Sequence, residues 1–367
     1  MTAPLRPFPL ADREARVARI MAAFRGAGAE TIALEALQPA EMLLDLYGED
    51  IRARAYVVRE GFRERMLRPD FTVPVVRHHI AAGRASARYA YQGPVWRRPS
   101  EGSDRPAESW QAGIEILGSE DRAAADAEVF SLVHTLLRDA PITVATGDLA
   151  LLRAAIGALS GPETRRQALL RHIWRPERFQ RLLGQFASPA TAKRALLDRV
   201  DAEGGAAVLG ASGKHVGLRS AEEILSRVGT LTQDATLPPV PETEIAVIRR
   251  VLALSGSLPE VARDVERLAN DVPALSPAAQ GFSARLSALD AFGIDLETLS
   301  FEGSFGRTTL EYYDGFVFGV LGRDRDDLPL IASGGRYDAL TEALGTDLPA
   351  IGAVVRPEAW LALEAGR

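Results

Sequence analysis

The chain has 367 residues, of which 47% are hydrophobic and 25% charged, a composition typical of soluble globular proteins with one large or two ordinary domains. It has no cysteine, which excludes disulfides, thiolate catalysis and cysteine-ligated zinc. The formal net charge of -6 gives no overall attraction to nucleic acid. The sequence shows neither a signal peptide nor an apolar run of about 18 residues, so we expect a cytoplasmic protein that does not enter a membrane.

The N-terminal region predicts a helix followed by short strands. Val17, Ile20 and Phe24 recur at helical spacing, which predicts a helix over 10–28. A second helix is expected to begin near Thr72, whose hydroxyl is a suitable cap. The strands expected between these helices are at 31–37, 53–58 and 64–68.

The most informative segment is 88–118, which we expect to form two antiparallel strands joined by a polar loop. Alternation along a strand places Gln111 and Glu115 on one face of the second strand. The same rule groups Tyr91 with Arg97 on the first strand. One sheet surface then carries a guanidinium, an amide and a carboxylate, with glycines where another group approaches the backbone. This pattern predicts the floor of a small polar pocket.

The rest of the chain predicts a discontinuous α+β domain with a helical insertion. Alternating patterns vanish over 161–275, where Ala, Leu and Arg dominate, so we expect an all-helical insertion there. The segments 1–160 and 276–367 are expected to form the main domain, a mostly antiparallel sheet flanked by helices. Further helices are expected at 121–138 and 148–159, and strands at 141–147, 299–305, 311–321, 328–334 and 350–355.

Several familiar site patterns are missing from the sequence. GASGKH at 210–215 is not a phosphate-binding loop, because Val208 stands where its first glycine belongs and His215 where it needs Ser or Thr. The five histidines do not have the spacing of metal ligands. We therefore expect neither a metal nor a bound cofactor.

Three further segments carry polar groups among apolar ones. They are RPDFT at 68–72, LEYYDGFVF at 310–318 and ASGGRYDAL at 332–340. Alone, each has an ordinary structural explanation: a capped helix, a core strand with tyrosines, and a turn between a strand and a helix. Together with the 88–118 hairpin, and in this order, they resemble the catalytic domain of histidyl-tRNA synthetase, a class II aminoacyl-tRNA synthetase.

This resemblance covers about 1–160 and 280–367 and implies the class II synthetase fold, with the helical insertion in the family's usual place. It also implies a histidine-binding site, in which carboxylates hold an ammonium or imidazole group, a guanidinium pairs with the α-carboxylate and tyrosines form the walls. The matching positions are Asp70, Thr72, Arg97, Gln111, Glu115, Tyr312 and Tyr313. Asp70 replaces a glutamate of the family. The alternative is that these side chains are core polar groups without a ligand.

The resemblance fails at positions that handle ATP. Arginines of the synthetase pattern are replaced by Ala107, Thr308 and Ala359. Arg307 and Arg356 lie near two of these positions but out of register. Each lost donor of this kind costs about 10²–10³ in rate, so we expect almost no activation of an amino acid. Guanidinium groups of Arg307 or Arg356 that converge with Arg97 on one cavity would contradict this expectation.

The resemblance reaches the end of the synthetase catalytic domain, so we expect no anticodon-binding domain and no nucleic-acid partner. With these departures, the sequence resembles the regulatory subunits of ATP phosphoribosyltransferase, which are a non-catalytic family. The resemblance implies a short-form catalytic subunit as partner in the first step of histidine biosynthesis, and histidine as the effector of feedback inhibition. It also implies a hetero-octamer with that partner and a homodimer alone. Two alternatives remain: a stand-alone synthetase paralogue that forms an aminoacyl-adenylate, and a scaffold that binds no ligand.

Overall fold

The computed structural model describes residues 8–40, 53–99, 102, 106–188, 191–211, 220–235, 237–307 and 312–366. The chain divides into two compact units. Unit 1 comprises Met1–Ala154 and Val251–Arg367, and unit 2 comprises Ala155–Arg250. Within the described ranges, no helix combines the length and the apolar character needed to cross a bilayer.

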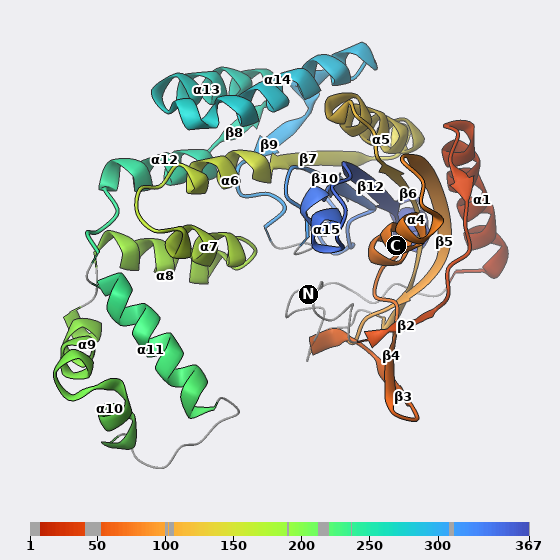
Figure 1. Cartoon of the computed structure of the whole chain (residues 1–367). Coiled ribbons are helices and arrows are strands. Elements are labelled where there is room, and N and C mark those ends of the chain that lie inside the picture. Colours follow the sequence, from red (N-terminus) through yellow and green to blue (C-terminus); the bar gives the residue numbers. More distant parts are fainter. Residues whose placement is uncertain are drawn as a thin grey trace. The chain divides into compact units, whose positions relative to one another are not determined.

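Unit 1 is built on one large sheet with helices on both faces (Figure 1). Its first half contains α1 (Leu10–Gly26), β1 (Glu30–Thr31), β2 (Leu37–Pro39), β3 (Val57–Glu60), β4 (Arg63–Leu67), α4 (Thr72–Ala82), β5 (Ala87–Trp96), β6 (Glu108–Leu117), α5 (Arg122–Leu137) and β7 (Ile142–Asp148). Its second half contains β8 (Ser255–Ser257), α13 (Leu258–Asp271), η1 (Pro273–Leu275), α14 (Ser276–Ala291), η2 (Leu296–Thr298), β9 (Ser300–Glu302), β10 (Phe316–Gly322), β11 (Ala332–Arg336), α15 (Asp338–Ala343), β12 (Ala350–Val355) and α16 (Pro357–Glu364). The chain passes between the units within α6 (Leu149–Gly157) and α12 (Glu242–Leu252).

In the described ranges, nine strands form the large sheet in the order β1-β5-β6-β12-β11-β10-β7-β9-β8. Neighbouring strands are antiparallel except for β1 with β5 and β7 with β9. The prediction of an α+β fold with a mostly antiparallel sheet is therefore confirmed. β6 and β12 are distant in sequence but adjacent in the sheet, so residues from both halves of unit 1 share one surface.

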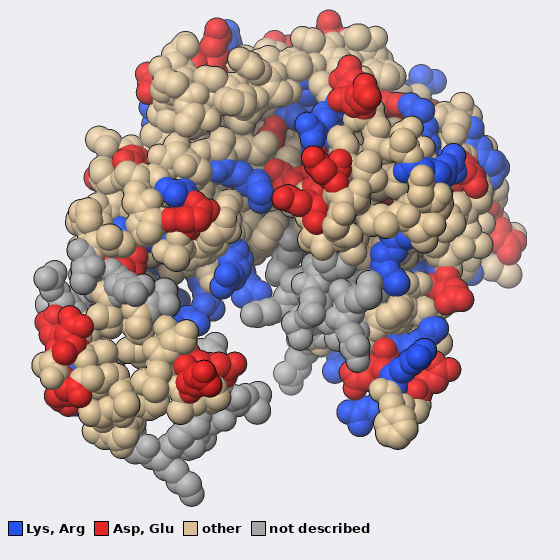
Figure 2. All heavy atoms as spheres, viewed as in Figure 1, with Lys and Arg blue, Asp and Glu red and all other residues tan. Residues whose placement is uncertain are grey.

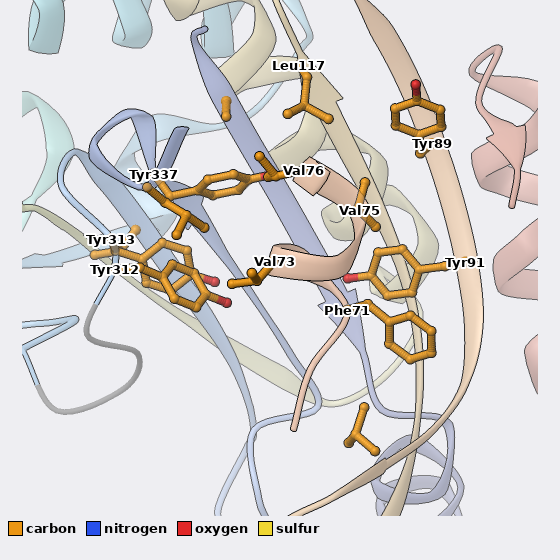
Figure 3. Close-up of a cluster of buried hydrophobic side chains, with 14 of the residues drawn as sticks. Phe71, Val73, Val75, Val76, Tyr89, Tyr91, Leu117, Tyr312, Tyr313 and Tyr337 are labelled. Atoms are coloured by element: carbon orange, nitrogen blue, oxygen red, sulfur yellow. The ribbon is translucent and has the colours of Figure 1, made fainter. Parts of the chain in front are cut away.

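Helices cover both faces of this sheet. α5 lies against one face, where Phe130 contacts Phe318 of β10 with ring centroids 5.1 Å apart. The strand register places three further residues on that face: Gly334, Ala353 and Ile114. α4 covers the opposite face, because its Thr72 hydrogen-bonds to Glu115 of β6. This opposite face holds the buried cluster of Figure 3 and the site described below.

Three of the described strands form a second, small sheet in the order β2-β4-β3. Its β3–β4 hairpin carries charges of both signs (Figure 2), with Arg59 paired to Glu64 and Arg65 to Glu60 at N···O distances of 3.3 and 3.5 Å. Phe62 is fully exposed at the turn. Exposed ion pairs of this kind contribute little to stability, so they serve mainly to keep the hairpin soluble.

Unit 2 is helical in the part that the structure describes. Its helices are α7 (Glu163–Arg171), α8 (Pro176–Ala187), α9 (Thr191–Glu203), α10 (Gly205–Ala211) and α11 (Ala221–Ala235). Arg165 of α7 is 4% exposed, and its guanidinium donates to the Asp234 carboxylate at 2.5 Å. It also donates to the main-chain oxygens of Asp234 and Pro238 at 2.9 and 2.8 Å. One buried guanidinium thus holds α7 to the end of α11 and the segment after it.

The unit boundaries differ from the domain limits expected from composition. We expected an all-helical insertion over 161–275, whereas unit 2 ends at Arg250. The segment after it contains β8, which pairs with β9 and so belongs to the sheet of unit 1. α13 begins directly after β8, with a capping box formed by Ser257 and Glu260. A strand of three residues is too short to leave an alternating pattern, which is why the sequence did not reveal it.

Candidate functional site

The predicted pocket floor lies on the α4 face of the sheet, around Glu115 of β6. β5 and β6 pair along the whole hairpin, with Tyr91 opposite Gly113 and Gly93 opposite Gln111. Residues opposite each other in a sheet share a face, so the grouping predicted from alternation is confirmed. The floor is extended by β12 and β11, which lie beside β6 in the sheet.

Two glycines make room for side chains on this floor. Gly352 pairs with Glu115 across β12 and β6, and a methyl group at Gly352 would overlap Oε2 of Glu115. A methyl group at Gly113 would overlap the ring and hydroxyl of Tyr91. At both positions the missing side chain lets a polar group lie flat against the sheet.

Glu115 is 1% exposed and is surrounded by hydroxyl donors. Its Oε1 accepts hydrogen bonds from Thr72 Oγ1 at 3.0 Å and from the Tyr91 hydroxyl at 3.1 Å. Its Oε2 accepts one from the Tyr337 hydroxyl at 2.6 Å. Burial raises the pKa of this carboxyl to about 7, although the three donors oppose the rise by stabilising the carboxylate. Glu115 therefore changes charge near neutral pH.

The start of α4 differs from the sequence prediction. Thr72 is the first helical residue and not the cap, and its hydroxyl donates to Glu115. The Thr72 amide donates to Oδ1 of Asp70 at 3.1 Å, so this carboxylate satisfies one free amide of the first turn, while Phe71 occupies the N-cap position. The Tyr312 hydroxyl donates to Thr72 Oγ1 at 3.2 Å. A chain of hydroxyl groups thus runs from Tyr312 through Thr72 to Glu115.

Tyrosines form the walls of the site (Figure 3). Tyr91 comes from β5 and stacks on Phe71, with ring centroids 4.3 Å apart. Tyr312, Tyr313 and Tyr337 come from the second half of unit 1, and Tyr312 contacts each of the other two rings edge to face. Burial raises the pKa of all these hydroxyls. They therefore stay protonated at neutral pH and are available as hydrogen-bond donors.

Two guanidinium groups border the site, contrary to expectation. Arg97 donates from Nε to a main-chain oxygen ahead of α4 at 2.8 Å. Arg356, which precedes α16, donates to the Leu330 oxygen and to Ser333 Oγ at 3.1 Å each, and it lines the same cavity as Arg97. Both charges act on Tyr313 and oppose the rise that burial causes in its pKa. Arg356 and Arg97 therefore do meet at one cavity, which is the arrangement that contradicts the expected loss of amino-acid activation.

The other positions compared with the ATP-binding arginines of the synthetases add no further guanidinium group to the described lining of the cavity. Ala107 lies beside Arg97, whose amide donates to the Ala107 oxygen at 2.9 Å. Ala359 is buried in α16. Neither alanine has a side-chain donor for a phosphate. Arg307 is buried and does not line the cavity, and Thr308 lies outside the described residues.

All the amino-acid-binding residues predicted from the sequence line one cavity: Asp70, Thr72, Arg97, Gln111, Glu115, Tyr312 and Tyr313. The cavity is small, about 20 Å³, whereas one water molecule needs roughly 10–15 Å³. An amino acid therefore enters only when part of the wall moves outward.

Among the side chains that hydrogen-bond to Glu115 in this cavity, sequence reasoning did not name Tyr91 and Tyr337 as binding residues. Both had a signal, because Tyr91 shares the face of the predicted floor and Tyr337 lies in the ASGGRYDAL segment. What the sequence did not show is that their hydroxyls meet at Glu115, since this depends on the pairing of β6 with β12 and β11.

The polar groups of the cavity suit an organic ion. Carboxylates accept hydrogen bonds from ammonium or imidazole, and guanidinium groups pair with carboxylates. Among the described residues, no group of three or more His, Cys, Asp or Glu side chains is arranged to hold a metal ion. Side chains of both charges and several hydroxyl donors thus line one cavity.

Comparison with known sequences places the chain among synthetase-like proteins. A model of the histidyl-tRNA synthetase family matches residues 4–247 and 230–359. The ATP phosphoribosyltransferase regulatory subunit of Allorhizobium ampelinum is 34% identical over 349 residues, which cover 90% of this chain and 92% of the relative. The subunit of the same description from Brucella canis is 32% identical over 351 residues, covering 88% and 90%.

Solved structures show the same fold. An ATP phosphoribosyltransferase regulatory subunit/histidyl-tRNA synthetase from Bacillus halodurans superposes with a TM-score of 0.69 at 18% identity, covering 98% of this chain and 82% of that chain. A histidine–tRNA ligase subunit from Alicyclobacillus acidocaldarius gives 0.63 at 20% identity, covering 98% and 95%. The predicted class II synthetase fold is confirmed.

Proposed function

Because this chain belongs to the family of ATP phosphoribosyltransferase regulatory subunits, we propose that it regulates that enzyme in the first step of histidine biosynthesis. In this role it binds and activates a short-form catalytic subunit in the cytoplasm, as a hetero-octamer, and confers feedback inhibition by histidine. The observation that carries the proposal is the convergence of every predicted amino-acid-binding residue on one cavity.

The cavity offers a partner for each polar group of histidine. Arg97 pairs with the α-carboxylate, and the carboxylates of Glu115 and Asp70 accept from the ammonium and imidazole groups. The tyrosines wall the imidazole ring. Because Glu115 has a pKa of about 7, a bound cation stabilises its ionised form, and histidine binding releases a proton near neutral pH.

Feedback inhibition follows from linkage. Histidine inhibits only if it binds the less active state of the complex more tightly than the active one. Couplings of this kind are typically about 1–3 kcal/mol, or roughly 5- to 150-fold in affinity. The small cavity offers a structural difference between the histidine-bound and histidine-free states. Bound histidine would hold the cavity wall further outward than it lies in this structure.

Calorimetry and reconstitution test this proposal. We expect the chain to bind histidine, and a short catalytic subunit to be active only when mixed with the chain and to be inhibited by histidine. Glu115→Gln should weaken histidine binding by about tenfold, because it removes the buried charge. Glu128→Gln, on α5 outside the cavity, is the matched control and should bind like the parent. A catalytic subunit that is unaffected by the chain would rule out regulation, and activation without histidine binding would indicate a scaffold.

The position of Arg356 favours a second candidate, the formation of an aminoacyl-adenylate. Two guanidinium groups at one cavity give more positive charge than the sequence suggested, and such charge stabilises the transition state of phosphoryl chemistry. Exchange of pyrophosphate into ATP in the presence of histidine measures this activity. Turnover that disappears in Arg356→Met would establish the enzyme. We expect no exchange, because Arg356 is committed to Leu330 and Ser333 and because Ala107 and Ala359 lack donors.

A further inference from the structure

β11 presents different side chains to the two faces of the sheet. Gly335 lies against the Tyr313 ring on the cavity face, and Tyr337 follows it on that side. Arg336, between them, points to the α5 face and is 7% exposed. There its Nε and Nη2 donate to Oδ1 of Asp126 at 2.9 and 2.6 Å. The residue next to Tyr337 is therefore anchored behind the sheet.

This anchor is part of a larger buried group, which we call the ion cluster: Asp126, Asp148, Arg285 and Arg336. Arg285 of α14 donates to Asp126 at 3.3 Å and also to Asp148 at the end of β7. All four residues are at most 7% exposed. The ion cluster thus joins α5, α14, β7 and β11 at the side of the sheet opposite to the cavity.

The other neighbour of Tyr337 is fixed as well. Asp338 accepts from Nη1 of Arg336 at 2.8 Å and from the Ala350 amide at 2.8 Å. The Tyr337 amide donates to the Ala350 oxygen at 2.9 Å, and Asp314 accepts from the Asp338 amide at 3.2 Å. With both flanking side chains and its own backbone held, Tyr337 has little freedom to move its hydroxyl away from Glu115.

Stability alone does not account for such a cluster. The attraction between buried charges barely offsets the free energy lost when they are removed from water. Apolar residues of similar size often stabilise a fold equally well. What the charged groups provide is a directional set of hydrogen bonds that fixes Arg336 in one rotamer. This fixed geometry holds the neighbouring Tyr337 so that its hydroxyl donates a hydrogen bond to Oε2 of Glu115 at 2.6 Å.

We propose that the ion cluster positions Tyr337 on Glu115 and thereby sets how tightly, and over which pH range, the cavity holds histidine. Its members are positioning residues, since none of them lines the cavity. The affinity part of this inference rests on the proposed function. The groups that face Glu115 itself are Asp70, Thr72, Tyr91, Tyr312, Tyr313 and Tyr337.

Asp126→Asn tests the inference, because it removes the charge that orients Arg336 and keeps the size of the side chain. The first readout needs no ligand: the melting temperature is measured against pH for the protein and for its Glu115→Gln version, and the difference reports ionisation of Glu115. In Asp126→Asn, we expect the Tyr337 hydroxyl to stop donating to Glu115, so that the carboxylate loses a stabilising hydrogen bond. The pH at which Glu115 ionises should then rise by about one unit. The second readout is histidine affinity, which should fall by about tenfold.

Controls separate positioning from loss of stability. Leu289→Ala empties a buried site one helical turn from Arg285 and removes no member of the ion cluster, so it should lower the melting temperature and leave the pH transition and histidine affinity unchanged. Asp338→Ala, at a half-buried position, replaces Asp126→Asn if that variant does not fold.

The two readouts distinguish two kinds of failure. If the parent protein binds no histidine, the proposed function fails, while the pH transition still reports on the ion cluster. If Asp126→Asn keeps the pH transition of the parent, the inference is overturned whatever its histidine affinity. An equal effect of Leu289→Ala on the transition would also overturn it.

Discussion

At the scale of single residues, Glu115 combines deep burial with three hydroxyl donors. Its folded-state pKa of about 7 lies above the ordinary 4.5, so the folded protein binds this proton more tightly than the unfolded chain. The contribution of the protonated Glu115 side chain to the free energy of unfolding is therefore fully present below pH 4.5 and is lost as the pH rises through 7. The amount lost is about 3 kcal/mol.

Glu115→Gln should remove this dependence. Chemical denaturation between pH 5 and 8 is expected to show a free energy of unfolding that falls with pH in the parent and falls less in the variant. Asp314, whose pKa burial raises to about 6, adds a slope of the same sign to both proteins. The difference between the two curves therefore isolates Glu115, and parallel curves would show that its pKa is not raised.

Gly352→Ala places a methyl group on Oε2 of Glu115. We expect a loss of about 1–3 kcal/mol in stability from overpacking, and loss of histidine binding measured by calorimetry. Gly281→Ala on α14 is the matched control, because a methyl group there meets no other atom within 4 Å. It should stabilise the helix by about 0.5–1 kcal/mol. Histidine affinity that survives Gly352→Ala would place the effector elsewhere.

At the scale of elements, the turn from β11 into α15 depends on one carboxylate. Asp314 accepts from the amides of Asp338 and Ala339 at 3.2 and 2.6 Å, which satisfies two donors at the start of the helix. Asp314→Ala should cost about 1–2 kcal/mol in urea denaturation. Asp314→Asn keeps one acceptor oxygen and should lose less. Equal losses in the two variants would argue against a capping role.

The elements also show what the sequence predicts well. Alternation gave the faces of β5 and β6 because both strands are long and half of each faces the cavity, and α1 follows the helical spacing of Val17, Ile20 and Phe24. Thr72 was misassigned as a cap because the N-cap position falls one residue earlier, at Phe71, and the Thr72 hydroxyl donates to Glu115. β8 was missed because three residues carry no period.

Arg356 shows where sequence reasoning about a site stops. Register arguments compare positions along one strand or helix, and by that measure Arg356 lies nearly a turn from the expected place. In the structure, however, its long side chain extends from the start of α16 to Ser333 on β11 and reaches the cavity. An arginine side chain is long enough to place its guanidinium at the cavity even when its Cα is nearly one helical turn from the expected position. The position of the charge therefore depends on how α16 packs against the sheet.

At the scale of the whole molecule, two compact units should respond independently to mutation. Arg165→Met leaves Asp234 and the Pro238 oxygen without their buried donor and should destabilise unit 2 by about 2 kcal/mol. Limited proteolysis should then cut within 155–250 at lower denaturant concentration than in the parent. Histidine affinity, which resides in unit 1, should be unchanged, and a parallel loss of affinity would indicate that the units are coupled.

The central place of β12 has a consequence for biosynthesis. Translation delivers β6 long before β12, the strand that pairs with it, so the nascent chain carries an open edge at β6 while unit 2 emerges from the ribosome. The cavity acquires its Gly352 floor only when β12 has been synthesised. Messages truncated before codon 350 leave the β6 edge unpaired and should yield insoluble protein.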